Sequence, residues 1–427
     1  MHFFRMSDTG IFITSKECIS IPQTHMYPLR VRKEPSMTRR YARVAAGLVV
    51  AAVLVTTALA GCSQKPADET GDATGAATTT VRIGFAAPLT GDNAIYGQGM
   101  KRAVEMAIAE ANDSAEAKAA GYEFVLAAQD DQADPKQAVN VANLLVGDTG
   151  VVAVVGHFNS GCSIPASPVY DRADMAMVSV SSNPQLTAQG FVTVNRIVAK
   201  DDAQGGAAAE LAYGTLGFRK VVVIDDSTPY GEGLATEFIK GFEAAGGQVL
   251  ATEKIQAKEV DFSALMTRFG AVDPDAIYYG GAHTEGALIS KQAKAAGLTV
   301  PVVGGDMLFS ADYVSIAGAT NAEGDLCTSL GLPLEQQPRG VDFKNAYLER
   351  FGQEPEAYDS YAYDSAWIII NAVLEAGTDR VAVAEAIRSL SYEGVTGTVD
   401  FDDAGDTKNA AISTYKVVGG AWEQLSR

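Results

Sequence analysis

The sequence predicts an α/β protein made of two doubly wound lobes, each a parallel sheet covered by helices on both faces. Strand-like apolar runs alternate with amphipathic helices, starting with VRIGFAA at 81–87, and such alternation is typical of parallel sheets. The same alternation starts again after about residue 200. The 347 residues from 81 to 427 are also more than one hydrophobic core usually organises, which favours two lobes.

The first series of elements lies between residues 81 and 199. The run VVAVV at 151–155 is wholly apolar and largely β-branched, which predicts a buried strand. In the helix expected over 98–112, apolar residues recur at three- and four-residue spacing. The remaining strands are expected at 81–87, 122–130 and 175–180, and the remaining helices at 136–146 and just after Ser163.

The second series starts near residue 200 and ends with a late return of the chain. Its strands are expected at 220–225, 247–255, 276–281, 301–306 and 324–330. Its helices are expected at 203–216, 232–245, 262–269, 285–296 and 311–317. Three more helices (336–351, 360–376 and 379–390) and two late strands (397–402 and 411–418) follow.

The late return predicts that the chain crosses between the lobes more than once. Lobe 1 is expected to comprise 81–199 plus about 331–410. Lobe 2 is expected to comprise about 200–330 plus about 411–427.

An export signal starts at Met37. A basic stretch with three arginines precedes 17 mostly apolar residues at 44–60, and LAGC closes the segment at Cys62. This arrangement resembles the lipobox of bacterial lipoproteins, which implies cleavage before Cys62 and a diacylglycerol on its sulfur. An uncleaved membrane anchor is the alternative, because 17 residues are at the short limit for spanning a bilayer.

The segments on either side of the signal have no core-forming pattern. Residues 1–36 carry mixed charges and prolines, and we expect them to be a gene-model extension ahead of a signal peptide at 37–61. Residues 62–80 are small and polar, which predicts a flexible tether between the lipid and the folded part.

Charge and cysteine content limit the possible functions. Beyond residue 61 the chain carries 25 Lys and Arg against 49 Asp and Glu, a net charge of −24. This acidity argues against a nucleic-acid partner and suits a body held off a membrane by a lipid. Two cysteines remain after Cys18 in the leader and Cys62 at the lipid site. Cys162 and Cys327 form a disulfide or stay as buried thiols, and the sequence leaves both possibilities open.

Common enzyme motifs are missing from the sequence. GHFNSGC at 156–162 is not a nucleophile elbow, because its serine is misplaced. No G-x-G-x-x-G follows the first strand, and there is no Walker A motif. The four histidines lack metal-ligand spacing, and His157 is expected to be structural. We therefore expect a binding protein without cofactor or metal, and not an enzyme.

Eight segments follow, in order, the landmarks of one family. They are DPKQAVNVANLLV (134–146), GHFNS (156–160), NPQLTAQG (183–190), YGEGLA (230–235), DFSALMTRF (261–269), YYGG (278–281), KQAKAAGL (291–298) and AEG (322–324). In these segments the chain resembles the leucine/isoleucine/valine-binding proteins, the substrate-binding subunits of ABC importers for branched-chain amino acids. The resemblance covers about 81–427. It implies the type I periplasmic-binding-protein fold, in which two Rossmann-like lobes are joined by three crossings and close on a ligand.

The resemblance implies a carboxylate site in the loop after 151–155, which has no Lys or Arg. Ser160 and neighbouring N–H groups are implied to hold the ligand's α-carboxylate, because orphan N–H donors and the helix dipole favour an anion at a helix N-terminus. Ser182, where the family usually has Thr, is implied to reach the carboxylate or the ammonium. Helix capping and turn formation are the alternative roles of both serines.

The ammonium partner implied by the resemblance is Asp306, at the end of the strand 301–306. The best-matched members carry Glu there, so lobe closure or a water must supply the missing reach. A buried ammonium needs such a partner. The alternative is a solvated Asp that caps the following helix.

Tyrosines are implied to form the walls of the cleft. Tyr96 and Tyr230 match tyrosines that line it from opposite lobes, and Tyr358 matches a further aromatic residue. Each of the three can instead be a packing residue. Ala282 stands where the best-matched members have Tyr, so the cavity is expected to be roomier there and the ligand's identity stays open.

The resemblance as a whole implies a lipid-anchored extracytoplasmic receptor, on the outer face of the cytoplasmic membrane or in the periplasm. We expect a monomer that captures an amino acid, a branched-chain one first, and delivers it to ABC permease subunits. Another amino acid, an amide or urea-like compound, or an aromatic acid are alternative ligands. A ligand sensor on the same fold and an extracellular hydrolase are alternative functions.

Overall fold

The structure, a computed structural model, describes residues 78–425. The predicted extension, the signal peptide, Cys62 and most of the tether lie outside the described residues. Strand β1 (Thr79–Ala87) includes the last two residues of the predicted tether, because Thr79 and Thr80 already pair with strand β2 (Tyr122–Asp130). Within the described part, no helix combines the length and the apolar character that crossing a membrane requires.

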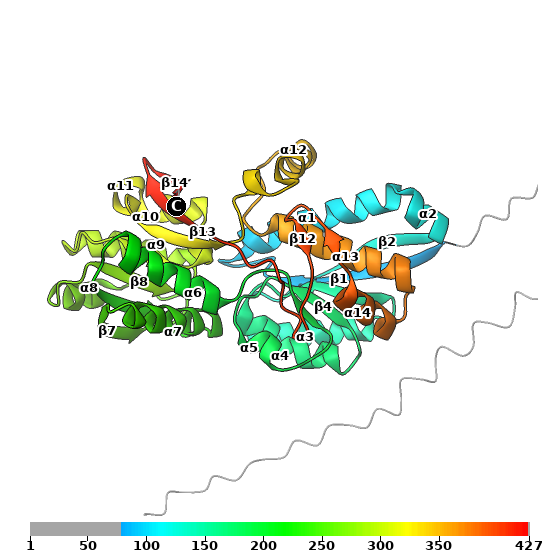
Figure 1. Cartoon of the computed structure of the whole chain (residues 1–427), viewed down its shortest axis with the longest axis horizontal. Coiled ribbons are helices and arrows are strands. Elements are labelled where there is room, and N and C mark those ends of the chain that lie inside the picture. The colour runs from blue at the N-terminus through cyan, green and yellow to red at the C-terminus, as the bar shows by residue number, and fades with distance from the viewer. Residues whose placement is uncertain (1–77, 426–427) are drawn as a thin grey trace, which may run out of the picture. The chain divides into compact units, whose positions relative to one another are not determined.

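Lobe 1 is built on a five-stranded parallel sheet in the order β2-β1-β3-β4-β5. Figure 1 labels β1, β2 and β4 of this sheet. Its remaining strands are β3 (Val151–Gly156), β4 (Ala176–Ser179) and β5 (Val194–Arg196). The connecting helices are α1 (Ala94–Asp113), α2 (Ala115–Ala120), α3 (Pro135–Gly147), α4 (Ser160–Asp171) and α5 (Gln185–Ala188). Helix α13 (Asp359–Ala376) packs along α1, and α14 (Arg380–Ser389) packs against β3 and β4. The end of the chain therefore completes the lobe that its beginning started.

Lobe 2 is built on a seven-stranded sheet in the order β14-β13-β10-β9-β8-β6-β7. The strands are β6 (Lys220–Asp225), β7 (Gln248–Lys254), β8 (Ala276–Gly280), β9 (Val302–Gly304), β10 (Leu326–Leu330), β13 (Ile412–Val418) and β14 (Ala421–Gln424). The helices are α6 (Asp201–Glu210), α7 (Pro229–Ala244), α8 (Ser263–Gly270), α9 (His283–Ala295), α10 (Ala311–Ala317) and α11 (Ala319–Ala322). Only β13 and β14 are antiparallel to their neighbours, so the chain returns from lobe 1 to extend an otherwise parallel sheet.

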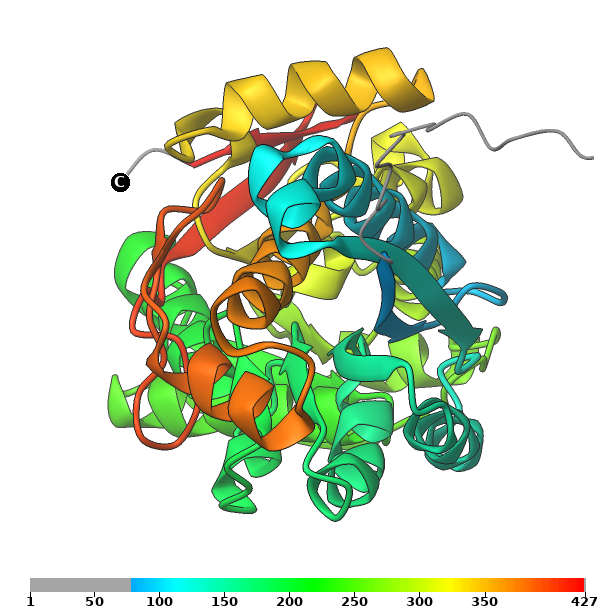
Figure 2. The same ribbon diagram turned by 90° about the vertical axis from the view of Figure 1, so that its right-hand side faces the viewer.

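The chain passes between the lobes three times, and the passages lie side by side. The first follows β5, and there the amide N–H of Arg196 donates to Gly405 of the third passage at 2.7 Å. The second follows β10, and there Gly331 donates to Ala411 of the third passage at 2.7 Å. Figure 2 views the same ribbon from the right-hand side of Figure 1, with the late helices in orange. These crossings form the predicted multi-crossing hinge, while the lobe boundaries at residue level stay a prediction.

Some element boundaries differ from the predictions for identifiable reasons. Helix α7 begins at Pro229 rather than 232, because the Thr228 side chain caps the N–H of Gly231 and proline is favoured at a first helical position. Helix α12 (Gly340–Phe351) begins four residues after its predicted start, because Pro338 disfavours helical geometry before it.

The strand predicted at 397–402 was wrong over most of its length. Only β12 (Thr398–Val399) is regular, and it pairs with β11 (Tyr392–Glu393), while Asp402 accepts turn hydrogen bonds from Ala404 and Asp406. Strands β5 and β14 were not predicted, because three or four residues with a charged side chain give no apolar run.

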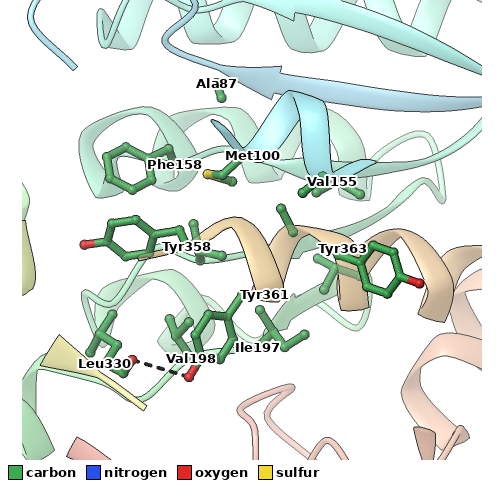
Figure 3. Close-up of a cluster of buried hydrophobic side chains, with 14 of the residues drawn as sticks. Ala87, Met100, Val155, Phe158, Ile197, Val198, Leu330, Tyr358, Tyr361 and Tyr363 are labelled. Carbon is green, nitrogen blue, oxygen red and sulfur yellow. Dashed lines mark hydrogen bonds between the residues drawn. The ribbon is translucent and has the colours of Figure 1, made fainter. Parts of the chain in front are cut away.

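Buried side chains of lobe 1 reach as far as lobe 2. Figure 3 shows the ring of Tyr358 beside that of Phe158, with centroids 4.9 Å apart. In the same cluster the Tyr361 hydroxyl donates to the carbonyl oxygen of Leu330 on β10 at 3.3 Å. The start of α13 therefore stands at the junction of the two lobes, where the candidate site lies.

Candidate functional site

The turn after β3 is fixed by a glycine and by serine hydroxyl groups. Gly156 has a φ of 129°, and a β-carbon there would lie 2.1 Å from the carbonyl oxygen of Ala86. The carbonyl oxygen of the next residue, His157, accepts hydrogen bonds from Ser179 at 2.8 Å and Ser163 at 3.2 Å. These contacts hold the turn at the carboxyl edge of the sheet, which is where open α/β sheets bind ligands.

The N-terminus of α4 presents free backbone donors. The N-cap residue Asn159 makes no side-chain cap hydrogen bond. Its carbonyl oxygen accepts from the N–H groups of Cys162 and Ser163, both at 2.9 Å. The N–H groups of Ser160 and Gly161 have no protein acceptor within residues 78–425. Two orphan donors at the positive end of a helix dipole can bind an anion without a basic side chain.

The histidine in this turn is structural, as the sequence predicted. His157 is fully buried, with Nδ1 2.7 Å from a carboxylate oxygen of Asp131 and Nε2 3.0 Å from the hydroxyl of Tyr170. Because both ring nitrogens have partners inside lobe 1, His157 has no free nitrogen to offer a ligand.

The two predicted serines lie on neighbouring loops and are both buried. Ser160 Oγ accepts only a long hydrogen bond, 3.4 Å from the N–H of Asn183. The carbonyl oxygen of Ser182 accepts from the N–H of Asp201, the first residue of α6, at 2.9 Å. Asn183 also reaches across to lobe 2, where its Nδ2 donates to the carbonyl oxygen of Pro229 at 2.5 Å. The loop that carries Ser182 therefore contacts both lobes.

Asp306 lies in the interior with three side-chain donors around it. It opens a single turn of 3-10 helix after β9, and its exposed fraction is 3%. Oδ1 accepts from Gln204 Nε2 and from the Tyr230 hydroxyl, both at 2.8 Å, and Oδ2 accepts from the Tyr358 hydroxyl. Burial raises the pKa of Asp306, and these three hydrogen bonds offset part of the rise. The alternative of a solvated loop Asp is therefore wrong.

Tyr96 joins the lobes beside this cluster. Its hydroxyl donates to the carbonyl oxygen of Met307 at 2.9 Å and lies 3.2 Å from His283 Nδ1. Its ring stacks on Phe158 with centroids 5.1 Å apart and meets Tyr358 edge-on at 5.5 Å. Burial raises the pKa values of Tyr96 and Tyr358 well above their ordinary range, so both hydroxyl groups act as neutral donors.

A pocket of about 240 Å³ lies next to these residues, between the two lobes. Lobe 1 lines it with the loops 90–93 and 132–135 and with the start of α4, and lobe 2 with 226–230, 257–258, Ala282, Glu285 and Met307. Of the predicted residues, Ser160 and Tyr230 line the pocket. Tyr96, Ser182, Asp306 and Tyr358 do not line it. Tyr230 connects the two groups, because it also donates to Asp306. The ligand-contact role of all six residues stays a prediction.

Two glycines allow Tyr230 to take this position. A β-carbon at Gly231 would lie 2.5 Å from the carbonyl oxygen of Gly280, and one at Gly280 would lie 2.4 Å from that of Gly231. The start of α7 can therefore lie directly against the end of β8, which brings Tyr230 to the pocket.

The pocket wall near Ala282 is polar and mainly acidic. Burial raises the pKa of Asp226 to about 6, and hydrogen bonds from Thr228 offset part of the rise. Burial also raises the pKa of Glu285, which accepts a hydrogen bond from the N–H of Lys258 at 2.5 Å. Lys258 supplies the only basic side chain among the described residues that line this pocket.

Two residues of the interior were missed by the sequence analysis. Asp201 and Gln204 are fully buried on one face of α6, and Gln204 bonds to Asp306. Burial and the neighbouring Asp306 raise the pKa of Asp201 to about 8, and Ser182 and Arg196 offset only part of this. The signal available was their i, i+3 spacing, but the helix was predicted to start at 203, which left Asp201 outside it.

The cysteine alternatives are resolved in favour of separate thiols. Cys162 lies on α4 in lobe 1 and Cys327 on β10 in lobe 2, and both are free and buried. Burial raises the pKa of both thiols, so neither is a reactive thiolate near neutral pH. Residues 78–425 also contain no group of three or more His, Cys, Asp or Glu side chains placed to hold a metal ion.

Two doubly wound lobes, three crossings and a pocket between the lobes define a two-lobed solute receptor. The profile of the family described as "Periplasmic binding protein" matches residues 80–421. The chain belongs to this family.

Similar proteins carry more specific names. A protein named "Leu/Ile/Val-binding protein homolog 1" from Brucella suis is 36% identical over 350 residues, which cover 81% of this chain and 93% of that protein. The crystal structure of a leucine-binding protein from Thermotoga maritima has a TM-score of 0.75 at 30% identity, covering 81% of this chain and 98% of that one. A branched-chain amino acid transporter substrate-binding protein from Streptococcus pneumoniae, in complex with isoleucine, has a TM-score of 0.73 at 26% identity, covering 82% of this chain and 100% of that one.

Proposed function

We propose that the protein is an extracytoplasmic receptor that binds leucine, isoleucine or valine and delivers it to the permease of an ABC importer. One observation carries the proposal. The interface between the lobes combines free N–H donors at the start of α4 with the buried carboxylate of Asp306. An α-amino acid offers an anion for the first and a cation for the second. The ligands named for the similar proteins support the branched-chain choice.

The carboxylate end of the ligand is assigned to α4. The N–H groups of Ser160 and Gly161 and the hydroxyl of Ser160 provide three donors at one helix terminus. The hydroxyl is available, because Ser160 Oγ otherwise only accepts a weak bond at 3.4 Å. A charge-assisted hydrogen bond is roughly twice as strong as a neutral one, so this site needs no Lys or Arg.

The ammonium end of the ligand is assigned to Asp306. A carboxylate has about four lone-pair positions, and Gln204, Tyr230 and Tyr358 occupy three of them. One acceptor position is therefore left for a ligand N–H. Asp306 is already desolvated by burial, so an ammonium restores the electrostatic stabilisation that its carboxylate has lost.

The mechanism we propose is closure of the lobes around the solute. Tyr96, Tyr358 and Asn183 already make hydrogen bonds from lobe 1 to lobe 2. A ligand that bridges α4 and Asp306 adds contacts that exist only when the lobes are together. Such differential contacts shift the population towards the closed state, which the permease can distinguish from the open one.

A second candidate ligand is an amino acid with a polar side chain. The pocket beside Ala282 is lined by Asp226, Glu285 and Lys258 rather than by branched aliphatic residues. A side chain that carries donors or acceptors would find partners on this wall, whereas that of leucine would contact Ala282, Pro229 and Met307.

We also propose that the chain is a monomeric lipoprotein, held at the outer face of the cytoplasmic membrane or in the periplasm through Cys62. The signal-like segment 37–61, the LAGC sequence and the polar segment 62–80 support this. We further propose that it catalyses no reaction, since the similar proteins are named for binding. In the described residues, moreover, the hydrogen bonds join no Ser or Cys side chain to a histidine ring.

Thermal unfolding of the full-length protein in mild detergent, with a panel of ligands, tests the proposal. A ligand at a hundredfold excess over its Kd adds about 2.7 kcal/mol of stability. We expect leucine, isoleucine and valine to raise the melting temperature and benzoate or urea not to. A rise with serine or glutamine alone would select the second candidate, and a rise with aromatic acids alone would exclude both.

A further inference from the structure

A groove at the junction of the two lobes shares no lining residue with the pocket described above. It has two adjoining parts, with volumes of about 400 and 550 Å³, which have Phe309, Trp422 and the segment 354–357 in common. Phe309 and Trp422 come from lobe 2, whereas the segment 354–357 directly precedes α13 of lobe 1. A groove of this size can hold a small organic molecule.

The lobe 2 wall of the groove is aromatic. The rings of Phe309 and Tyr415 lie with their centroids 4.1 Å apart, and the ring of Trp422 lies 6.1 Å from that of Phe309. Trp422 is held in place, because its indole Nε1 donates to the carbonyl oxygen of Ser310 at 3.0 Å. Phe309 and Trp422 are partly buried, so their rings remain partly accessible from the groove. Such a surface binds hydrocarbon groups and attracts cations to the faces of its rings.

The groove also carries an excess of negative charge. Its acidic and basic side chains are those of Glu335, Glu354, Glu356 and Lys344. Lys344 Nζ lies 3.1 Å from a carboxylate oxygen of Glu335 and 3.0 Å from one of Glu354, so two carboxylates share its single positive charge. Glu356 takes part in no ion pair among the described residues. Burial raises the pKa of Glu356, so a cation beside it would stabilise a carboxylate that water solvates poorly.

A buried acceptor without a partner lines the same groove. Gln337 follows the second passage between the lobes, and its exposed fraction is 7%. Its Nε2 donates to the carbonyl oxygen of Leu332 at 3.1 Å, which fixes the orientation of the amide. Its Oε1 has no hydrogen-bond partner within residues 78–425. Buried polar atoms are rarely left in this state, so a ligand with a hydrogen-bond donor suits this wall of the groove.

We propose that this groove is a second ligand site, and that it binds a small organic cation with an ammonium group on a hydrocarbon or aromatic body. The inference goes beyond the receptor function, because none of these residues lines the pocket assigned to the transported solute. An ammonium group has three N–H donors and no acceptor, which suits the Gln337 amide oxygen, and its charge suits Glu356. The body of the ligand then packs on the aromatic wall.

The same features disfavour the other classes of small ligand. An anion would face three carboxylates against the single ammonium group of Lys344. A neutral alcohol can donate to Gln337, but it leaves Glu356 without a counter-charge. A bare metal ion would gain nothing from the rings of Phe309 and Trp422, which offer no oxygen or nitrogen atom towards it other than the indole N–H, and that is a donor.

Tryptophan fluorescence of the full-length protein in mild detergent tests the inference. The chain has two tryptophans, Trp367 and Trp422, and only Trp422 lines the groove. Trp367→Phe therefore leaves a single reporter inside the site. The probes are 2-phenylethylammonium and its neutral counterpart 2-phenylethanol. The test variant is Glu356→Gln, and the matched control is Glu349→Gln, an exposed residue of α12 outside the groove, both made in the Trp367→Phe protein.

We expect 2-phenylethylammonium to change the Trp422 fluorescence in a saturable way. Glu356→Gln should weaken this binding roughly tenfold, because it removes a charge-assisted interaction, and Glu349→Gln should leave it unchanged. 2-Phenylethanol should bind roughly tenfold more weakly than the cation and should not distinguish Glu356→Gln from its parent. Saturating L-leucine should not displace the cation, because the groove and the pocket share no lining residue. Gln337→Met, which removes the unpartnered acceptor, should also weaken binding of the cation.

Three results would each overturn the inference. The first is a Trp422 signal that does not respond to the cation, or that responds equally in the parent and in Glu356→Gln. The second is equal affinity for 2-phenylethanol, which would mean that the groove selects an aromatic body and not a charge. The third is displacement of the cation by L-leucine, which would place the cation in the pocket between the lobes. The receptor function would stand in all three cases, since it depends on other residues.

Discussion

Asp306→Asn removes the negative charge at the centre of the site and keeps the size and shape of the side chain. The amide keeps the size of the carboxylate, but its nitrogen cannot accept hydrogen bonds. At least one of the donors Gln204, Tyr230 and Tyr358 therefore loses its partner. A buried donor left unsatisfied costs about 1–3 kcal/mol, so the unliganded variant should melt at a lower temperature than wild type.

The larger expected effect is on binding. Breaking one half of a buried ion pair costs about 3–5 kcal/mol. Asp306 has one acceptor position left for the ligand, and the hydrogen bonds from Gln204, Tyr230 and Tyr358 already stabilise its charge. We therefore expect the lower end of that range, about 3 kcal/mol, which is a little over a hundredfold in Kd. The binding free energy of 4-methylpentanoate, which is leucine without its amine, should change little, because that ligand has no ammonium group.

The assay is calorimetric titration of L-leucine and 4-methylpentanoate into wild type and variant, below the melting temperature of each. The substitution changes the binding free energy of each ligand, and the difference between these two changes is the coupling energy between the Asp306 carboxylate and the ligand amine. Asp342→Asn, an exposed residue on α12, serves as the control with the same chemical change. A coupling energy near zero would mean that Asp306 does not bind an ammonium. The branched-chain assignment would then be dropped, while the family assignment would stand.

Three further predictions concern the carboxylate site, the titration of the interior and the membrane anchor. Ser160→Ala should weaken leucine binding roughly 10- to 100-fold. The melting temperature of the unliganded protein should hardly change, because the Ser160 hydroxyl makes only one weak hydrogen bond within the protein. A large loss of stability with full affinity would point to a structural role. In the folded, unliganded protein the pKa of Asp201 is raised to about 8 and that of Asp359 to about 7, so both hold protons that the unfolded chain releases. The free energy of unfolding should therefore fall from about pH 5 to pH 8, by at most about 1.4 kcal/mol per pH unit for each of these two carboxyl groups. Denaturant titrations should show a shallower fall for Asp201→Asn, and an equal slope would refute its titration. Cys62→Ser should abolish lipid labelling and membrane retention, and unchanged labelling would contradict the lipoprotein proposal.

The sequence predicted the larger elements because their signals are local. The buried strand 151–155 and the helix around 98–112 follow directly from runs and spacings of apolar residues. Helix starts were less accurate where a cap outweighed periodicity, as at Thr228 and Pro229. The short strand β5 could not be predicted, because Val194–Arg196 is defined by its pairing with β4 and not by its own composition.

The candidate site was predictable only in part, and for a different reason. Small polar residues after strands identified the loops that carry Ser160 and Ser182. The linear sequence does not show that Asp306 accepts hydrogen bonds from Tyr230 and Tyr358, because these residues lie 76 and 52 positions away along the chain. Asp201 was missed because a charged residue at a helix start usually faces solvent. Its helix α6 packs against α7, β10 and β13, which come from distant parts of the sequence, so the burial of Asp201 cannot be seen in its own segment.

Native mass spectrometry of the full-length protein, exchanged into a mixture of amino acids, amides and aromatic acids, tests the central claim most directly. We expect one bound molecule per chain with the mass of leucine, isoleucine or valine, and loss of that signal in Asp306→Asn. A bound amide or aromatic acid, or an unchanged protein mass in the complete mixture, would contradict the claim that this receptor recognises an amino acid by both of its charged ends.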